Sequence, residues 1–542
     1  MLSLQTKTPR DGTLEFSQQH PIKENMAQKS EKTQPPAINA PTKELEKALE
    51  LLRAKDDTSR FVGLALLKPV LEQELSRKGG TEEEGTRTVI EQCWRAIPVK
   101  FLDRLLKTKL ESKRTREEVG SMVGLAVAVL HAFMTIMDAP EKDDRFVGRV
   151  PLLMSVLRST PPETATQIME ILATLATTRE GSQAVFGARD KDEKTDQKPK
   201  SYIFVTVLLI DIRSTIPSLQ ERLHSAKYPD ISERIARAYD IISAFIGFLV
   251  QSLEALDNDD DNEDVGSGPG FPAPMPGDLL MKLRANISEV MSLTIEHLRD
   301  RYDSSTAGAA GLHPSARTLG EGSASPLPIA WDTSSGISED PLTLSQLRAL
   351  SLWLREEEND ALRTEASSIM DVFLALYQDI SGQDFRYPVL LSLEGISEIA
   401  EGVEAFLREE GWAILTADLE NYILPIPSEH PRGIEIIRVL LAVVEADVTG
   451  PAKEEWMPIV EVARQSVVHA ADATNLELGV AICQLAVELM VRAPRGIRNR
   501  RRSAVVELQK YAEALLAKVD GASGGVRDGL EEVVQGLNSL SL

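Results

Sequence analysis

The chain has 542 residues and a formal net charge of −23, because its 83 Asp and Glu outnumber its 60 Lys and Arg. Hydrophobic residues make up 42% of it, which is enough for a packed core and excludes a wholly disordered chain. The acidic surface repels phosphate groups, so we expect no general binding of nucleic acid or of anionic membranes. Basic protein surfaces are the better electrostatic match.

Two cysteines and the first residues of the chain indicate a reducing compartment. Cys93 and Cys483 lie far apart in apolar surroundings, which excludes a disulfide framework. Residues 1–6 lack the basic-then-apolar order of a signal peptide. The longest apolar stretch, 122–137, is shorter than a comfortable membrane span and contains His131, so it predicts a buried helix. We therefore expect a cytoplasmic protein without a transmembrane segment.

Composition divides the chain into helical blocks and segments that are too polar to bury a core. The predicted parts in chain order are a disordered tail over 1–38, an N-terminal helical repeat block over 39–255, an acidic Pro/Gly-rich loop over 256–277, a connecting helix over 278–302, a disordered linker over 303–341 and a C-terminal helical repeat block over 342–540. Within the first block, residues 187–200 are almost purely charged and polar and predict a further disordered loop.

Apolar residues in both blocks recur with the period of an α-helix. In one clear example they fall at i, i+3, i+4, i+7, i+8 and i+11, at Ala366, Ile369, Met370, Phe373, Leu374 and Tyr377. The best strand candidate, 202–212, is a continuous apolar run that fits a strand and a buried helix equally. No repeat of fixed period is visible. Roughly twenty helices joined by short turns predict an all-α protein, an armadillo/HEAT-like α-solenoid with a disordered N-terminus and loops.

Four blocks of residues resemble the neurochondrin family, and they occur in the family's order. In the first half they are 45–67 (LEKALELLRAKDDTSRFVGLALL), 96–109 (AIPVKFLDRLLKTK) and 149–157 (RVPLLMSVL). In the second half, block 347–374 carries an apolar helix that ends in W-L-x-E-E and a helix that begins L-R-x-E. Its matching residues are Trp353, Leu354, Glu356, Glu357, Leu362, Arg363 and Glu365. The resemblance spans most of the helical part of the chain.

The resemblance implies an armadillo-like helical fold in a cytoplasmic, non-enzymatic scaffold that binds other proteins in signalling or trafficking. Animal members are associated with neurite outgrowth, kinase-pathway modulation and endosomal trafficking. Those members carry N-terminal cysteines suited to palmitoylation, whereas residues 2–5 here are Leu, Ser, Leu and Gln. We therefore expect no membrane attachment by that route and transfer no neuronal role. The family offers no catalytic or cofactor-binding residue to carry over.

Two glycine-rich motifs come close to active-site patterns and fail on specific residues. Residues 521–525 fit G-x-S-x-G, but the residues before Ser523 are helical and no histidine follows. A nucleophile elbow needs a strand there and a histidine, so a turn between helices is favoured. Gly80 and Gly85 have the spacing of a phosphate loop, but a Thr-Arg pair stands where Lys-Ser/Thr is required.

The acidic and histidine residues show no metal-binding signature. Asp257, Asp259 and Asp261 mimic the start of a calcium loop, but the sixth and twelfth positions lack the required Gly and Glu. A solvated loop is favoured, and docking of Asp259, Asp260 and Asp261 onto a basic partner stays open. The seven histidines are scattered, and His131 is expected to be a hydrogen-bonded core residue. We predict no catalytic residue, no cofactor and no metal.

One basic cluster stands out on this acidic protein. Its members are Arg492, Arg495, Arg498, Arg500, Arg501 and Arg502, and Ser503 follows them. The favoured interpretation is an arginine-rich turn that pairs with nearby acidic surfaces. The alternative is a partner-binding or nuclear-import patch that phosphorylation of Ser503 would weaken, which would give the protein access to the nucleus.

Two other functions remain alternatives to the scaffold. An importin-like transport adaptor for basic cargo would carry regular Asn/Trp ladders, and the five tryptophans, at 94, 331, 353, 412 and 456, form none. An enzyme would need a cryptic site assembled from distant residues, such as His131 and a carboxylate. A deep pocket with convergent ionisable residues would favour the enzyme, and a shallow groove would not.

Overall fold

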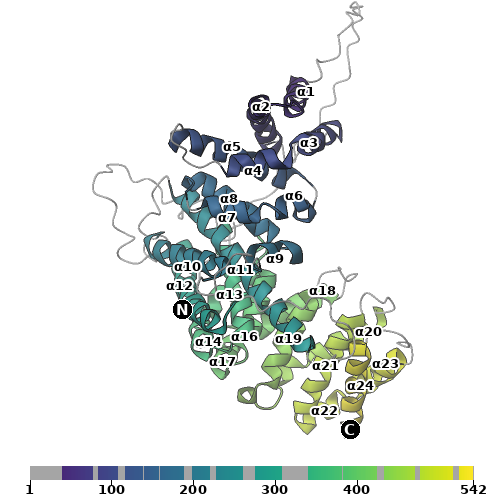
Figure 1. Cartoon of the computed structure of the whole chain (residues 1–542). Helices are drawn as coiled ribbons and strands as arrows, with labels where there is room; N and C mark the ends of the chain where they lie inside the picture. Colours follow the sequence, from purple (N-terminus) through teal and green to yellow (C-terminus); the bar gives the residue numbers. More distant parts are fainter. Residues whose placement is uncertain are drawn as a thin grey trace, which may run out of the picture.

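The computed structural model of the chain is helical throughout its described residues and contains no strand in them (Figure 1). The described residues are 40–76, 84–107, 116–137, 139–157, 159–187, 198–219, 227–259, 275–307, 340–380, 382–423, 432–469, 476–516 and 524–540. The predicted tail over 1–38 lies outside them, as do most residues of the predicted loop and linker.

The first half of the structure runs from α1 to α12. Its helices are α1 (Ala40–Leu52), α2 (Asp57–Ser76), α3 (Glu84–Ala96), α4 (Val99–Leu106), α5 (Arg116–Ile136), η1 (Pro140–Lys142), α6 (Asp144–Val147), α7 (Val150–Leu157), α8 (Pro162–Leu175), α9 (Arg179–Phe186), α10 (Lys200–Leu219), α11 (Tyr228–Asp259) and α12 (Gly277–Ala307). Residues 202–212 lie in α10, so the buried helix is correct and the strand is not. Helices α11 and α12 extend a few residues into the segments where the loop and the linker were predicted.

The second half runs from α13 to α24. Its helices are α13 (Pro341–Glu356), α14 (Asp360–Ser367), α15 (Met370–Gln378), α16 (Arg386–Ile396), α17 (Ala400–Arg408), α18 (Gly411–Ile423), α19 (Arg432–Glu445), η6 (Asp447–Thr449), η7 (Glu454–Trp456), α20 (Pro458–His469), α21 (Leu476–Arg492), α22 (Arg495–Arg500), α23 (Arg502–Leu516) and α24 (Gly524–Ser539).

A turn between α14 and α15 interrupts the helix that the apolar period over 366–377 predicts. The Ser367 hydroxyl donates to the Thr364 carbonyl at 2.7 Å, and the Ser368 hydroxyl donates to the Glu365 carbonyl at 2.6 Å. Serine hydroxyls that bind carbonyls of the preceding turn compete with the backbone ladder. The apolar face continues across the turn because the apolar residues on both sides are buried in the same core.

A single row of helices, which we call the helix ladder, runs the length of the chain. Its members pack one on the next in the order α2, α5, α8, α11, α13, α16, α19, α21 and α24 (Figure 1). The other helices pack against this ladder and against one another. One cluster of buried apolar side chains extends from Leu45 to Leu540, and each fully buried Leu, Val or Phe contributes about 1.5–3 kcal/mol. This stacking confirms the predicted armadillo/HEAT-like α-solenoid.

Helix α12 joins the two halves into one continuous solenoid. It packs against α10, α13 and α14, while α11 packs extensively on α13. Polar contacts cross this junction inside the core, since the Tyr239 hydroxyl lies 2.7 Å from Thr294 Oγ1. His297 Nδ1 lies 3.1 Å from Gln346 Oε1. Burial lowers the pKa of His297 to about 4, so this histidine is neutral in the folded protein near pH 7.

Two arginines fix the packing of the N-terminal helices. The Arg145 guanidinium lies 4.2 Å from the centroid of the Trp94 ring and donates to the Trp94 and Ile97 carbonyls, each at 2.6 Å. Arg149 is only 2% exposed, and its Nε donates to Asp103 at 3.0 Å. These contacts tie α3 and α4 to α6 and to the residue that precedes α7. Because they join a buried and a half-buried cation to fixed acceptors, they resist relative movement of those helices.

A short motif occurs twice in these helices. The sequence R-F-V-G stands at 60–63, near the start of α2, and again at 145–148, near the start of α6. An aspartate precedes it each time, and its Oδ1 accepts from a backbone N–H: Asp56 from Ser59 at 2.7 Å and Asp143 from Arg145 at 2.8 Å.

Among the described residues, three helices are long and apolar enough to cross a membrane, judged by length and composition alone. They are the windows Glu117–Ile136 in α5, Lys200–Leu219 in α10 and Tyr228–Leu253 in α11. The prediction that the stretch 122–137 is too short for a span was therefore wrong, because the apolar window begins earlier, at Glu117. In the solenoid, 44%, 50% and 56% of the three windows are buried inside the protein. Their apolar residues form part of the core between neighbouring helices.

Candidate functional site

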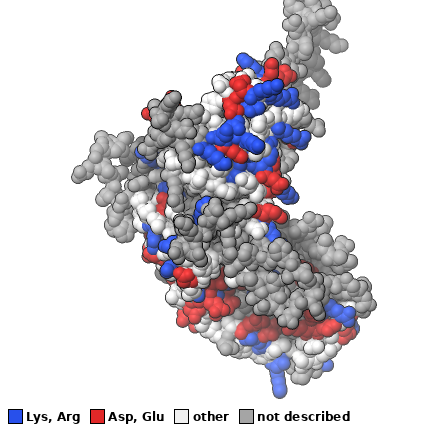
Figure 2. All heavy atoms as spheres, in the orientation of Figure 1, with Lys and Arg blue, Asp and Glu red and all other residues white. Residues whose placement is uncertain are grey.

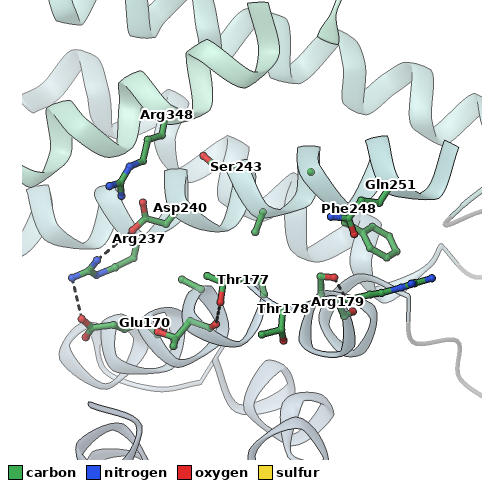
Figure 3. Close-up of a pocket in the computed structure, with 16 residues that line it drawn as sticks. Glu170, Thr177, Thr178, Arg179, Arg237, Asp240, Ser243, Phe248, Gln251 and Arg348 are labelled. Carbon is green, nitrogen blue, oxygen red and sulfur yellow. Dashed lines mark hydrogen bonds and ion pairs between the residues drawn. The ribbon is translucent and has the colours of Figure 1, made fainter. Parts of the chain in front are cut away.

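A hollow of about 480 Å³ opens on the helix ladder between α8 and α11 and is bounded by α9 and α13 (Figure 3). We call it the central groove. Its residues come from four helices and the turn before α9, and Glu170, Thr178, Arg237, Asp240, Gly247 and Arg348 mark its extent. One end of the groove is ionic, and the rest is lined by small or neutral residues together with Arg179.

A chain of hydrogen bonds and ion pairs fixes the ionic end of the central groove. The two oxygens of Glu170 lie 2.5 Å from His131 Nε2 and 3.0 Å from an Arg237 nitrogen. Arg237 also pairs with Asp240 at 3.3 Å. The hydrogen bond from His131 lowers the pKa of Glu170, although burial acts in the opposite direction. The chain connects α5, α8 and α11 and holds Glu170 ionised.

Arg348 enters the same end of the groove from α13. Figure 3 shows its side chain directed toward Arg237 and Asp240. The side chain is exposed, and it forms no ion pair with another residue in the part of the chain that the structure describes. Arg237 is therefore paired with carboxylates of the protein itself, whereas the guanidinium N–H donors of Arg348 face solvent.

The neutral part of the groove is open at Gly247. A Cβ atom built on this glycine meets no other atom within 4 Å. Ala173, Ala176 and Ala244 keep the walls low on either side, and the hydroxyl of Ser243 lies nearby. The groove therefore leaves room for a foreign main chain along α11.

A second hollow of about 790 Å³ lies between α2, α5 and α8. We call it the N-terminal groove, and Lys68, Gly120, Gly124, Thr160 and Glu163 mark its extent. Its α8 residues, Glu163 and Gln167, continue along the helix to Glu170 and Thr174 of the central groove at a spacing of three to four. Both grooves therefore open on the same face of α8.

The arginine cluster predicted from the sequence forms a turn at the end of the ladder, away from both grooves. Arg492 ends α21 and pairs with Glu488 at 2.5 Å, and Arg500 ends α22 and pairs with Glu454. No ion pair to another described residue occurs at the remaining members, which are Arg495, Arg498, Arg501 and Arg502. The structure thus brings the six together locally, and its two ion pairs are of the kind expected for an arginine-rich turn.

The structure describes only some of the acidic candidate residues and of the residues in the glycine-rich motifs. Asp257 and Asp259 belong to the last turn of α11, and Gly85 belongs to α3. Asp260, Asp261, Gly80 and Ser523 lie outside the described residues. A helical backbone at Asp257 and Asp259 does not have the geometry of a calcium loop.

The remaining candidates for chemistry have ordinary structural surroundings. No group of three or more His, Cys, Asp or Glu that could hold a metal ion occurs among the described residues. Burial raises the pKa of Cys93 to about 11 and that of Cys483 to about 12, so both thiols stay protonated. His131 is hydrogen-bonded as predicted, but its side chain is 20% exposed rather than fully in the core.

Sequence reasoning missed the central groove because its residues are separated along the chain. Glu170, Arg237 and Arg348 belong to three helices, and no local pattern joins them. One signal was available. Gly247 lies in the interior of a long apolar helix, where a glycine costs about 1 kcal/mol relative to alanine. A glycine in that position indicates a close approach or an open surface.

Charge is distributed unevenly over the molecule. On the face shown in Figure 2, Lys and Arg gather over the N-terminal helices in the upper part of the view, and Asp and Glu gather over the lower part. The net charge of −23 therefore does not describe each surface separately. The preference of a given groove depends on its own side chains.

The family of the chain follows from a comparison of its sequence with family models. The family model described as Neurochondrin matches residues 40–191 and 189–506, which include most of both halves. The chain belongs to the neurochondrin family. This confirms the resemblance drawn from the four sequence blocks, and it joins both halves of the helix ladder in one family pattern. A search of curated protein sequences finds no match.

Solved structures with similar architecture cover most of the chain at low identity. An engineered protein is 14% identical with a TM-score of 0.45, and the match covers 92% of this chain and 99% of that one. A structure from a study of a phosphorylation switch between cadherin and β-catenin is 13% identical with a TM-score of 0.35, covering 91% and 90%. Importin beta is 12% identical with a TM-score of 0.27, covering 91% and 66%. Similarity at this level adds nothing to the fold described above.

Proposed function

We propose that this neurochondrin-family protein is a non-enzymatic scaffold of the cytoplasm that binds segments of partner proteins, with the central groove as its principal site. The observation that carries the proposal is the open stretch of this groove at Gly247, where four helices leave space that no side chain of the described residues fills. Stacked helices present such surfaces to extended partners in repeat proteins generally. Two buried, unpaired thiols support a reducing compartment.

The ionic end of the groove favours binding over catalysis. The structure brings His131 to a carboxylate, as the enzyme alternative requires. However, one oxygen of Glu170 contacts His131 and the other pairs with Arg237. Both oxygens of this carboxylate are therefore already occupied by contacts that join helices. The importin-like alternative needs a groove for basic cargo, and the guanidinium of Arg348 disfavours such cargo here.

A bulky side chain at Gly247 tests the proposal. Gly247→Leu places a bulky side chain in the groove at a position where its Cβ meets no described atom within 4 Å. A matched control is Gly277→Leu, since a Cβ at Gly277 also meets none but Gly277 lies outside the groove. Affinity purification at native expression followed by quantitative mass spectrometry compares the variants with the unaltered protein. We expect a reproducible set of partners that Gly247→Leu loses and Gly277→Leu retains. Unchanged partners in Gly247→Leu, or no reproducible partner at all, would contradict the proposal.

A further inference from the structure

We propose that the central groove takes an extended polypeptide segment with an acidic side chain, whose carboxylate pairs with Arg348. This inference rests on the proposed function and adds the chemistry of the partner. It commits to one kind of occupant, a peptide main chain along α11 with an aspartate or glutamate at the α13 end.

The charge of the groove is the first argument. Three arginines and two carboxylates line it: Arg179, Arg237 and Arg348, with Glu170 and Asp240. The groove thus carries one net positive charge on a protein whose total is −23. A cationic groove in an acidic protein selects against basic segments and for acidic ones, because each wrong charge is placed next to a like charge.

The ion pairs already formed within the groove indicate which arginine is available to bind the acidic side chain of the segment. We call that arginine the anchor. Glu170 and Asp240 both pair with Arg237, so each of these carboxylates already has a cationic partner within the protein. Arg348 is exposed and unpaired among the described residues, and its side chain is directed into the same end. A guanidinium presents parallel N–H donors that match the two oxygens of a carboxylate. The anchor is therefore Arg348 rather than Arg237.

The shape of the groove indicates an extended segment. Beyond the ionic end, the wall along α11 is formed by Ser243, Ala244, Gly247 and Gln251, which lie at i, i+1, i+4 and i+8 and so share one side of the helix. Gly247 weakens α11, yet no contact within the described protein needs the missing side chain. The Ser243 hydroxyl donates its own proton to the Tyr239 carbonyl at 3.0 Å and can accept from a main-chain N–H, and the amide of Gln251 can donate or accept. The open glycine position allows that main chain to approach the helix.

The test uses the full chain and a phage-displayed library of random dodecapeptides as the probe. Clones selected on the unaltered protein are re-tested on Gly247→Leu and on its control Gly277→Leu, which identifies the groove-dependent clones. Each of these clones is then measured on Arg348→Glu and on Arg53→Glu. Arg53 is a matched control because it is exposed, forms no ion pair with a described residue and lies outside the groove. Circular dichroism confirms that every variant keeps its helix content.

We expect the groove-dependent clones to be enriched in Asp and Glu over the library. Arg348→Glu weakens their binding about tenfold or more, the size of one charge-assisted hydrogen bond, and Arg53→Glu leaves it unchanged. Replacing the acidic residue of a clone by Lys restores part of the affinity for Arg348→Glu.

Two results would overturn the inference, and they separate it from the proposed function. If groove-dependent clones show no acidic enrichment, or bind Arg348→Glu as well as the unaltered protein, the acidic partner is wrong while the groove remains a binding site. If no clone depends on Gly247, the central groove is not a peptide site and both proposals fail.

Discussion

The N-terminal half and the α21–α23 turn use the same residue type in opposite ways. In the first half, Arg149 and Arg237 lie between helices and bind carboxylates that come from other elements. In the turn, Arg492 pairs with the glutamate four residues before it, and Arg500 pairs across the surface with Glu454. The arginines of the turn attract attention because they are close together in the sequence. An arginine stabilises the fold more, however, when it is buried and pairs with a carboxylate from another helix.

The largest loss of unfolding free energy is expected when Arg149 is replaced. Arg149→Ala leaves the Asp103 carboxylate and two backbone carbonyls without their donor in a buried site, which destabilises the protein by about 3–5 kcal/mol. Arg500→Ala removes a pair whose side chains are 62% and 51% exposed and costs about 0.5 kcal/mol or less. Urea denaturation followed by circular dichroism measures both. Similar losses of unfolding free energy in the two variants would contradict the expected difference between the N-terminal half and the turn.

A buried histidine at the junction of the two halves is expected to make the unfolding free energy depend on pH. The folded pKa of His297 is about 4 against an ordinary value of 6.5, so the unfolded chain takes up a proton first as the pH falls. The stability that this residue contributes is complete above pH 6.5 and is lost as the pH falls toward 4, by about 3 kcal/mol. The difference in unfolding free energy between the unaltered protein and His297→Gln isolates this titration from those of the carboxylates. A difference that does not vary between pH 4 and 6.5 would contradict the assignment.

A smaller effect is expected in the central groove. Arg237→Ala leaves Glu170 and Asp240 without their shared cation in a site where each is 21–29% exposed, and we expect a loss of about 1–3 kcal/mol. Arg348→Ala removes a side chain with no ion pair among the described residues, so it changes the unfolding free energy by less than about 0.5 kcal/mol. Thermal unfolding of the two variants distinguishes them. A large loss in Arg348→Ala would show that its guanidinium has a structural role.

The smallest effect on stability is expected in the turn itself. Reversal of Arg501 and Arg502 to Glu leaves the unfolding free energy within about 0.5 kcal/mol, because neither forms an ion pair with a described residue. Adding Arg500→Glu then tests whether the turn binds a partner or directs nuclear import. Unchanged partners and an unchanged distribution between cytoplasm and nucleus in the triple variant would leave the turn with a solvated surface role alone.

The order of apolar and polar residues along the chain specifies that this protein is a stack of amphipathic helices. The spacing of residues such as Ile369, Phe373 and Leu374 follows the helical period whatever each helix packs against, and the four family blocks are contiguous stretches. Even there, the period did not reveal the turn at Ser368, because the apolar face continues across it. A local pattern reports the geometry of one helix and the face that it buries.

The tertiary structure alone decided which helices meet and therefore where the grooves lie. Helix α11 packs on α13 although the whole of α12 intervenes, and this contact brings Arg348 to the ionic end that Glu170 and Arg237 form. Many pairings of apolar faces satisfy the same periodicity. The choice among them depends on side-chain fit and on buried polar contacts such as Tyr239 with Thr294, which form only when the helices are in place.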